Sequence, residues 1–538
     1  MKRRRFFTAS AAGMATLAVT GVTGVAGCTS SPGGGSAEGG NPLPPFEFEE
    51  LGVARLGEMM ASGELTAEAL CRKYLERIEL LNPLLNAVIE VNPDALAIAR
   101  QLDAERKEGR VRGPLHGLPV LIKDNIDSGD QLQTTAGSLA LEGHRAAADA
   151  PVVALLREAG AVLLGKTNLS EWANFRSEMS SSGWSGRGGQ SRNPYALDRS
   201  PCGSSSGTGA AVAANLCTLG IGTETNGSVV CPSGVCGIVG LKPTLGLWSR
   251  RGIIPIAHSQ DTAGPMCRSV ADAAFLLGAL AGFDDQDAPA PVPRGEFFRD
   301  YTSFLDPDGL RNTRIGIARE MLGFHPQVDA LFGQAVELLK ARGAEIIDHL
   351  TFPKSREAGA ASYQVLLYEF KSGLNAYLAS HPSAPVRSLT ELIAYNEAHK
   401  EKEMPWFGQE IFLAAEAKGD LTSPEYLEAL AASKKGWGEE GIDAVMNEHR
   451  LDAIIAATNG PAWTIDPVNG DHFSGSSSSP AAISGYPNIT VPMGFVHGLP
   501  VGISFFGKAW SEPTLLRLAY AYEQASLHRK PPTLKATL

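Results

Sequence analysis

The hydrophobic positions of this chain alternate between helical and strand spacing along most of its length. The clearest helical pattern covers residues 65–81, where Thr66 is a plausible N-cap. Its apolar positions share one face: Leu70, Tyr74, Ile78 and Leu81. This segment is therefore predicted to be an amphipathic helix packed against a core.

Other segments repeat the alternation. Short apolar runs predict buried strands at residues 118–122, 161–164, 451–456 and 488–492. Helices are predicted at residues 151–158, which begin with proline, and at residues 514–525. Because strands and helices alternate, the sequence predicts an α/β fold. Residues 284–293, rich in Asp, Ala and Pro, are either a domain linker or a surface loop.

Composition and charge narrow the class of protein. The chain has 538 residues, of which 43% are hydrophobic and 20% charged, as in an ordinary globular protein. Its net charge of -11 disfavours a nucleic-acid partner, because phosphate backbones are bound by clustered Lys and Arg. The acidity is interpreted as a solubility feature.

The N-terminus has the pattern of an export signal. Residues 2–7 read Lys-Arg-Arg-Arg-Phe-Phe, and an apolar stretch of small residues follows to about Ala26. The paired arginines resemble a twin-arginine signal, and the alternative is an N-terminal membrane anchor. The apolar stretch is short and rich in Gly, Ala and Thr, which disfavours the anchor.

A possible lipidation site ends this signal. Residues 25–28 read Val-Ala-Gly-Cys and resemble a bacterial lipobox, in which Cys28 would be acylated. The alternative is a small-residue cleavage site with a cysteine beside it by chance. Residues 29–45 are rich in Ser, Gly and Pro and are expected to be a flexible linker. We therefore expect a signal at 1–28, a linker at 29–45, a catalytic domain at 46–538, and an exported bacterial lipoprotein of the periplasm or cell envelope.

Six further cysteines follow Cys28 in the chain. Their spacings match no zinc pattern, since they form no paired C-x-x-C units. Disulfides are permitted outside the cytoplasm, but a chain of this length does not need them. We therefore expect all six to be buried free thiols: Cys71, Cys202, Cys217, Cys231, Cys236 and Cys267.

Two short segments match well-known sequence motifs, but the secondary structure predicted around them does not fit those motifs. Residues 160–167 fit the phosphate-binding G-x-x-x-x-G-K-[ST], yet the interior Ala-Val-Leu-Leu favours a buried strand over a loop. Residues 203–207 fit G-x-S-x-G and would make Ser205 a nucleophile. The helix that should follow is present at 209–216, but residues 193–201 are irregular where a strand is required.

A longer pattern carries a family resemblance. A Gly- and Ser-rich block runs from 203 to 215, continues through 222–228 and ends at 236–244. Upstream, residues 117–125 read Gly-Leu-Pro-Val-Leu-Ile-Lys-Asp-Asn, and residues 498–503 read Gly-Leu-Pro-Val-Gly-Ile. Together these blocks resemble the amidase signature family from about residue 51 to residue 526. The resemblance implies one large α/β domain, with a mixed twisted β-sheet covered by helices on both faces, and no metal or cofactor.

The resemblance also implies a Ser-Ser-Lys triad. Ser228 would be the nucleophile, Ser204 the bridging serine that follows a cis peptide bond, and Lys123 the base. A serine hydroxyl needs a base, and a lysine of ordinary pKa, roughly 10.4, is protonated at neutral pH. The apolar run before Lys123 would bury its amine and lower the pKa.

The same resemblance implies an oxyanion hole of backbone N–H groups: Thr225, Asn226, Gly227 and Ser228. Two positions depart from the family. Asn226 stands where glycine is frequent, and Val230 stands where arginine is frequent, so any charge role of that arginine is absent.

Several blocks look closest to the peptide amidase branch, which removes the C-terminal amide of peptides. They are residues 168–175, 259–266 and 477–483. Within the first, Trp172, Asn174 and Phe175 are candidate substrate contacts, and the alternative for them is core packing. We expect a small-molecule or peptide amide substrate, no nucleic acid, membrane contact only through a lipid, and a monomer.

Other functions stay open at this point. A glutamyl-tRNA amidotransferase subunit is disfavoured by the export signal and the acidic surface. A hydrolase of aryl or aliphatic acyl amides is the main alternative. From a different class, the chain could be a lipid-tethered binding protein that has lost catalysis, although the intact lysine and serines argue against this.

Overall fold

The first predicted helix is α2 (Ala67–Leu85), in which all four apolar residues of the expected face are buried. The Thr66 side chain accepts a hydrogen bond from Ala69 N, as expected for the N-cap.

The computed structural model describes residues 45–288, 290 and 292–538. The predicted signal, Cys28 and residues 29–44 of the predicted linker lie outside the described residues. Within the described residues, no helix is both long and apolar enough to cross a bilayer.

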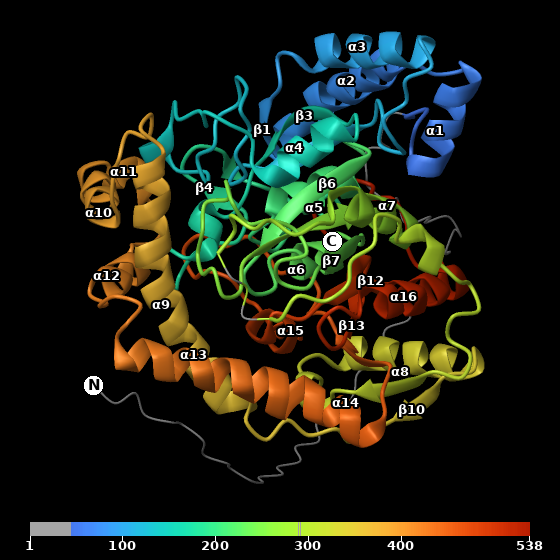
Figure 1. The fold of residues 1–538 in the computed structure, drawn as a ribbon, viewed down its shortest axis with the longest axis vertical. Helices are drawn as coiled ribbons and strands as arrows, with labels where there is room; N and C mark the ends of the chain where they lie inside the picture. The colour runs from blue at the N-terminus through green and yellow to red at the C-terminus, as the bar shows by residue number, and fades with distance from the viewer. Residues whose placement is uncertain (1–44, 289, 291) are drawn as a thin grey trace, which may run out of the picture. The chain divides into compact units, whose positions relative to one another are not determined.

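A mixed sheet of 11 strands forms the centre of the fold, in the order β1-β3-β2-β6-β8-β7-β12-β13-β11-β9-β10 (Figure 1). The strands are β1 (Val88–Val91), β2 (Pro119–Lys123), β3 (Val162–Thr167), β6 (Leu219–Glu224), β7 (Val239–Lys242), β8 (Thr262–Cys267), β9 (Arg314–Ile317), β10 (Glu345–Ile347), β11 (Ala453–Ala457), β12 (Asn488–Val496) and β13 (Leu499–Phe506). β2 pairs in parallel with both β3 and β6, whereas β6 pairs antiparallel with β8. A separate hairpin joins β4 (Trp184–Ser185) to β5 (Gly189–Gln190).

Helices lie on both faces of the central sheet and in a group beside it. They are α1 (Val53–Ser62), α3 (Ala95–Lys107), α4 (Pro151–Glu158), α5 (Ser206–Ala213), α6 (Val230–Val235), α7 (Val270–Leu280), α8 (Pro326–Ala341), α9 (Ser355–Ser380), α10 (Leu389–Ala398), α11 (Lys400–Glu403), α12 (Glu410–Glu416), α13 (Pro424–Trp437), α14 (Ala444–His449), α15 (Ser479–Ser484) and α16 (Glu512–Ser526), in addition to α2.

Strand β11 shows how both faces are buried. Alternate residues of a strand point to opposite faces. Ile455 joins the core cluster that also contains residues of α8 and α16, while Ile454 and Ala456 join the cluster that contains residues of α13, α14 and α15. The sheet therefore lies between two helical layers, and the fold is the single large α/β domain expected from the resemblance.

The remaining element predictions are mostly confirmed. α4 has the predicted bounds, β2, β3, β11 and β12 overlap the four predicted strands, and α16 overlaps the closing helix. The segment 284–293 does not divide the fold into domains, since the described residues cluster as one compact unit. The surface-loop alternative is therefore the correct one for the described part of that segment.

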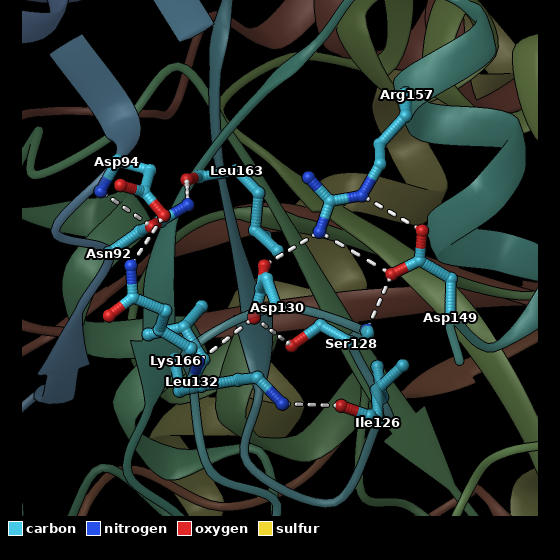
Figure 2. A network of polar contacts seen from close by, with 12 residues as sticks. Asn92, Asp94, Ile126, Ser128, Asp130, Leu132, Asp149, Arg157, Leu163 and Lys166 are labelled. Carbon is cyan, nitrogen blue, oxygen red and sulfur yellow. Dashed lines mark hydrogen bonds and ion pairs between the residues drawn. The ribbon is translucent and has the colours of Figure 1, made fainter. Parts of the chain in front are cut away.

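The segment whose sequence fits a phosphate-binding loop is a strand, as predicted. β3 runs through its interior and every residue of β3 is buried. Lys166 is also buried, and its Nζ donates to Ile126 O at 2.6 Å and to Thr134 Oγ1 at 3.1 Å. Figure 2 shows this lysine directed at the Ile126 carbonyl. Lys166 thus holds the loop after β2 and binds no phosphate there.

Candidate active site

Strand β2 carries Lys123 into the protein interior. Its sequence Pro-Val-Leu-Ile-Lys is apolar until the last residue, and all five residues are buried because β3 and β6 flank the strand. Lys123 itself has no exposed surface. A cation without solvent has to find polar partners or lose its charge.

The contacts of Lys123 join it to two other segments. Its Nζ lies 2.7 Å from Ser204 Oγ and 2.9 Å from Thr223 Oγ1. Burial lowers the pKa of Lys123 to about 7, and this effect outweighs the opposite influence of the Asp261 and Glu224 carboxylates. A substantial fraction of the amine is therefore neutral near pH 7 and able to accept a proton.

Ser204 lies in the loop before α5. The Gly203–Ser204 peptide bond is cis, which confirms the expectation drawn from the family resemblance. The neighbouring Ser205 is placed differently: its Oγ donates to Thr223 O at 3.0 Å, and its side chain is buried. Among the described residues no strand leads directly into this turn, since the last strand before it is β5 (Gly189–Gln190), so the nucleophile-elbow geometry is absent.

Ser228 lies in the turn between β6 and α6 and is 8% exposed, at the wall of a cleft. Its carbonyl accepts a hydrogen bond from Ser205 N at 3.2 Å, which brings the two serine segments together. In the described chain, no hydrogen bond joins Ser228 Oγ to Ser204 Oγ. The structure therefore places Lys123 and Ser204 in contact and Ser228 beside them.

The turn around Ser228 is held by a buried carboxylate, Glu224. One oxygen accepts from Gly227 N at 2.8 Å, and the other accepts from Val229 N at 2.8 Å and Val230 N at 3.1 Å. The Gly227 N–H, expected among the oxyanion donors, is therefore engaged by the Glu224 carboxylate in this structure. Within the described residues, the N–H groups of Thr225, Asn226 and Ser228 have no hydrogen-bond partner. These three remain available for an oxyanion.

Asp261 supports the same turn from the other side. It accepts hydrogen bonds from Thr225 Oγ1 and, at 2.8 Å, from both Ile256 N and Ala257 N. Burial raises the pKa of the Asp261 carboxyl to about 6. A carboxylate at this place fixes Thr225 and adds negative potential near the Lys123 amine.

The two residues that depart from the family have structural roles. Asn226 is held by the segment after β11, since its Oδ1 accepts from Ser478 Oγ at 2.6 Å and its Nδ2 donates to Ser479 Oγ at 3.2 Å. Val230 is buried at the start of α6. Residues 477–483, quoted above for the peptide amidase branch, thus meet the turn that carries Ser228.

A disulfide joins the two serine segments: Cys202 is bonded to Cys231. The expectation of free thiols is therefore wrong for these two residues and correct for the other four, which are buried and unbonded. The pairing was not apparent from sequence because only the fold brings the loop before α5 against α6.

The cleft beside Ser228 has a volume of about 580 Å³. Of the three predicted substrate contacts, Asn174 and Phe175 line it, whereas Trp172 does not. Trp172 is 2% exposed and packs edge-on against Phe412, so the core-packing alternative holds for it. Asn174 Oδ1 is buried and has no hydrogen-bond partner among the described residues. It is therefore a free acceptor at the wall of the cleft.

The backbone at this wall is unusual. Trp172, Ala173 and Asn174 have φ angles of 49°, 54° and 68°, in the left-handed region that residues with a Cβ rarely adopt. Such conformations persist only where the surroundings enforce them, and they concentrate at functional sites. The turn presents Asn174 and Phe175 to the cleft.

Sequence reasoning missed three residues that complete the arrangement: Thr223, Glu224 and Asp261. The available signal was the composition of residues 222–228, where one acidic residue stands among Gly, Ser, Thr and Asn. A lone carboxylate before a small-residue turn is suited to accept the backbone N–H groups of that turn. Asp261 lies in a quoted family block but carried no assigned role.

Comparisons with known proteins agree with this geometry. The family described as Amidase matches residues 69–516 of the chain. A probable amidase of Arabidopsis thaliana is 43% identical over 498 residues, covering 90% of this chain and 92% of that protein. The native peptide amidase of Stenotrophomonas maltophilia has a similar structure, with 52% identity, a TM-score of 0.86, and coverage of 91% of this chain and 99% of that chain. A structure of peptide amidase with the competitive inhibitor chymostatin is 52% identical and has a TM-score of 0.88, covering 90% of this chain and 100% of that chain.

Proposed function

This chain belongs to the amidase family and is a hydrolase of amide carbon–nitrogen bonds. We propose that it removes the C-terminal amide of peptides and that Ser228, Ser204 and Lys123 form its catalytic triad. Ammonia and a peptide carboxylate would be the products. The observation that carries the catalytic part is the 2.7 Å contact between the fully buried Lys123 Nζ and Ser204 Oγ.

The proposed reaction has two halves. In the first, Ser228 Oγ attacks the amide carbon, its proton passes to Ser204 Oγ, and the Ser204 proton passes to neutral Lys123. The tetrahedral oxyanion accepts hydrogen bonds from backbone N–H groups of the turn around Ser228. The proton then returns through Ser204 to the leaving nitrogen, the carbon–nitrogen bond breaks, and ammonia departs.

In the second half, water attacks the acyl group on Ser228. It gives one proton through Ser204 to Lys123, and the collapse of the second tetrahedral intermediate returns a proton to Ser228 Oγ. Lys123 ends the cycle neutral, as it began. A lysine can serve in this way only if its pKa lies near the working pH, and burial supplies that shift.

The cleft supports a peptide as the acyl part. Apolar side chains line it, among them Phe175, Ile411 and Trp463, and Asn174 Oδ1 offers an acceptor for a peptide N–H. A volume of about 580 Å³ exceeds what a single amino-acid side chain fills. The resemblance to peptide amidases over about nine-tenths of the chain also favours this substrate class.

The test is a competition among amides, with ammonia and new carboxylates measured by mass. Dipeptide and tripeptide amides should be cleaved faster than single amino-acid amides, because remote binding positions the carbonyl against the oxyanion donors. Internal peptide bonds should survive, and a Ser228→Ala variant should release no ammonia. Preferred hydrolysis of fatty or aryl amides, with no ammonia from peptide amides, would instead place the protein with the alternative substrate class.

We further propose that the protein is exported and held at the cell envelope by a lipid on Cys28. The signal-like residues 1–28 support this, as does the Cys202–Cys231 disulfide, since such bonds persist mainly in oxidising compartments. A lipid-bearing N-terminus followed by a Ser- and Gly-rich linker would leave the catalytic domain free in solution near the membrane.

A further inference from the structure

A cluster of metal-ligand side chains lies outside the catalytic cleft. Asp127 follows β2, His144 follows the short helix η1 (Leu139–Leu141), and His381 ends α9. One ligand atom from each residue lies within 4.8 Å of the other two. Asp127 and His144 are buried, and the side chain of His381 is 17% exposed. None of the three lines the cleft beside Ser228.

Hydrogen bonds fix which nitrogen of His381 carries its proton. Nδ1 lies 2.7 Å from Tyr377 O, and a carbonyl can only accept. Ser380 Oγ, 3.0 Å from the same Nδ1, gives its own proton to Tyr377 O and so also accepts. Nδ1 must therefore be protonated. In the neutral ring, Nε2 then directs its lone pair at Asp127 Oδ2, 3.0 Å away, and either a proton on Nε2 or a metal cation there would satisfy both atoms.

The same reasoning applies to His144. Its Nδ1 lies 2.9 Å from Ser383 Oγ, whose hydroxyl donates to Arg145 O at 3.1 Å. With the Ser383 proton on Arg145 O, Nδ1 is the protonated nitrogen and Nε2 directs a lone pair into the cluster. The Tyr377 hydroxyl lies 3.5 Å from this Nε2 and donates its single proton to Asp127 Oδ1 at 2.8 Å. A proton on His381 would not satisfy this buried nitrogen, whereas a cation among the three ligands would.

The backbone around Asp127 is held in place. Asp127 N donates to Gly252 O at 2.7 Å, and Asp127 O accepts from Ala150 N at 3.1 Å. Figure 2 shows the adjoining residues of the loop fixed by Arg157, which joins Asp130 to Asp149. A rigid carboxylate with its second oxygen engaged by a tyrosine is the outer-shell support that metal ligands need.

We propose that Asp127, His144 and His381 form a structural site for a divalent transition-metal ion of the zinc type. Two imidazole nitrogens and a carboxylate oxygen are ligands that zinc accepts, with water as a fourth ligand. In a tetrahedral site such ligand atoms lie about 3.3 Å apart, so side-chain adjustments of roughly 1 Å would close the cluster on the ion. The resemblance to the family implied no metal, and this site departs from that expectation.

The fold also favours a cation at this position. His381 is the C-cap of α9, and the carbonyls at the end of a helix present partial negative charge. The ion would fasten this end of α9 to Asp127, which lies four positions after Lys123 in the loop that follows β2. Leu366 of α9 lines the cleft, so the clamp would stabilise one wall of the site.

The experiment measures metal binding by the full chain. Protein freed of metal with a chelator is titrated with Zn²⁺ in the presence of a chromophoric competitor, and separately with Co²⁺, whose visible absorption reports tetrahedral coordination. The expected result is one ion per chain and an increase of Tm on binding. Asp127→Asn and His381→Ala should each weaken binding by on the order of 100-fold or more.

A matched control is available in α10. His399 Nδ1 lies 2.9 Å from Tyr395 O, and its ring stacks on Tyr395 at 4.0 Å, as the His381 ring stacks on Tyr377. In the part of the chain that the structure describes, no carboxylate contacts the His399 ring, so His399→Ala should leave the affinity unchanged. Absence of stoichiometric binding by the wild-type chain overturns the proposal, as does equal loss of affinity in His399→Ala and His381→Ala. The wild-type stoichiometry and Co²⁺ spectrum decide the matter even if a variant fails to fold.

Discussion

Lys123 Nζ and Ser204 Oγ lie 2.7 Å apart in a region from which solvent is excluded on the lysine side. This contact links strand β2 to the loop before α5, two segments that are remote in sequence. Lysine is ordinarily a cation, but burial lowers the pKa of Lys123 to about 7 and makes its amine a candidate base. The predictions below depend on this contact and on the turn beside it.

The first prediction concerns pH. In the proposed mechanism the neutral form of Lys123 is the active form. This form predominates above the pKa, so kcat/KM should rise with pH, bend near pH 7 and then level off. A lysine of ordinary pKa would instead let the rate climb about tenfold per unit beyond pH 9. The measurement is the profile of kcat/KM for a dipeptide amide between pH 5 and about 9.5.

Two variants control this assignment. The Asp261 carboxylate raises the pKa of Lys123, so Asp261→Asn should move the bend to lower pH. Lys123→Ala should lower the rate by on the order of 100-fold or more while the fold, followed by circular dichroism, is kept. Near-normal activity in a folded Lys123→Ala protein would remove the basis of the triad.

The second prediction concerns Glu224. In Glu224→Gln, one of the two oxygens becomes an NH₂ donor facing backbone N–H groups of the turn. We expect kcat to fall by roughly 10- to 100-fold with little change in KM, and the free energy of unfolding to fall by about 1–3 kcal/mol. Steady-state kinetics and denaturant unfolding measure both, and Glu337→Gln, at an exposed position, is the control. An unchanged kcat would show that Glu224 does not position the turn.

The third prediction concerns the disulfide. Alkylation of the denatured, unreduced protein should leave Cys202 and Cys231 unmodified and joined in one peptide pair. The Cys202→Ala/Cys231→Ala double variant should lose about 2–4 kcal/mol of unfolding free energy. Peptide mapping and thermal unfolding provide these measurements. Alkylation of both residues without a reductant would refute the bond.

The fourth prediction concerns location. The mature protein should fractionate with membranes and face away from the cytoplasm, because a lipid on Cys28 would retain it. Cys28→Ser should leave the protein soluble or uncleaved. Mass analysis of the N-terminal peptide is the decisive measurement, and an unmodified Met1 would refute both export and lipidation.

The strands and short helices of the catalytic core could be predicted because each has one local signal. α4 begins at a proline, and β2 is an apolar run that ends at a lysine. The helices between residues 355 and 449 could not be predicted in the same way. In α9, Phe370 packs into one cluster and Val365 and Tyr368 into another, so burial on several faces obscures the 3.6-residue period.

Only those residues of the candidate active site that lie in a recognisable sequence motif could be predicted. Lys123, Ser204 and Ser228 lie in recognisable blocks, but the partners of the turn do not. Nothing local shows that Gly227 N–H is directed at Glu224, or that Cys202 meets Cys231. These contacts depend on tertiary packing, which sequence periodicity does not encode.

Ser228 is the proposed nucleophile, and covalent labelling distinguishes it from Ser205. A fluorophosphonate probe reacts with an activated serine, so peptide mapping of the labelled protein should place the adduct on Ser228. Ser205→Ala should retain the label, since Ser205 Oγ is engaged by Thr223 O. An adduct on Ser205, or loss of labelling in Ser205→Ala but not in Ser228→Ala, would contradict the account.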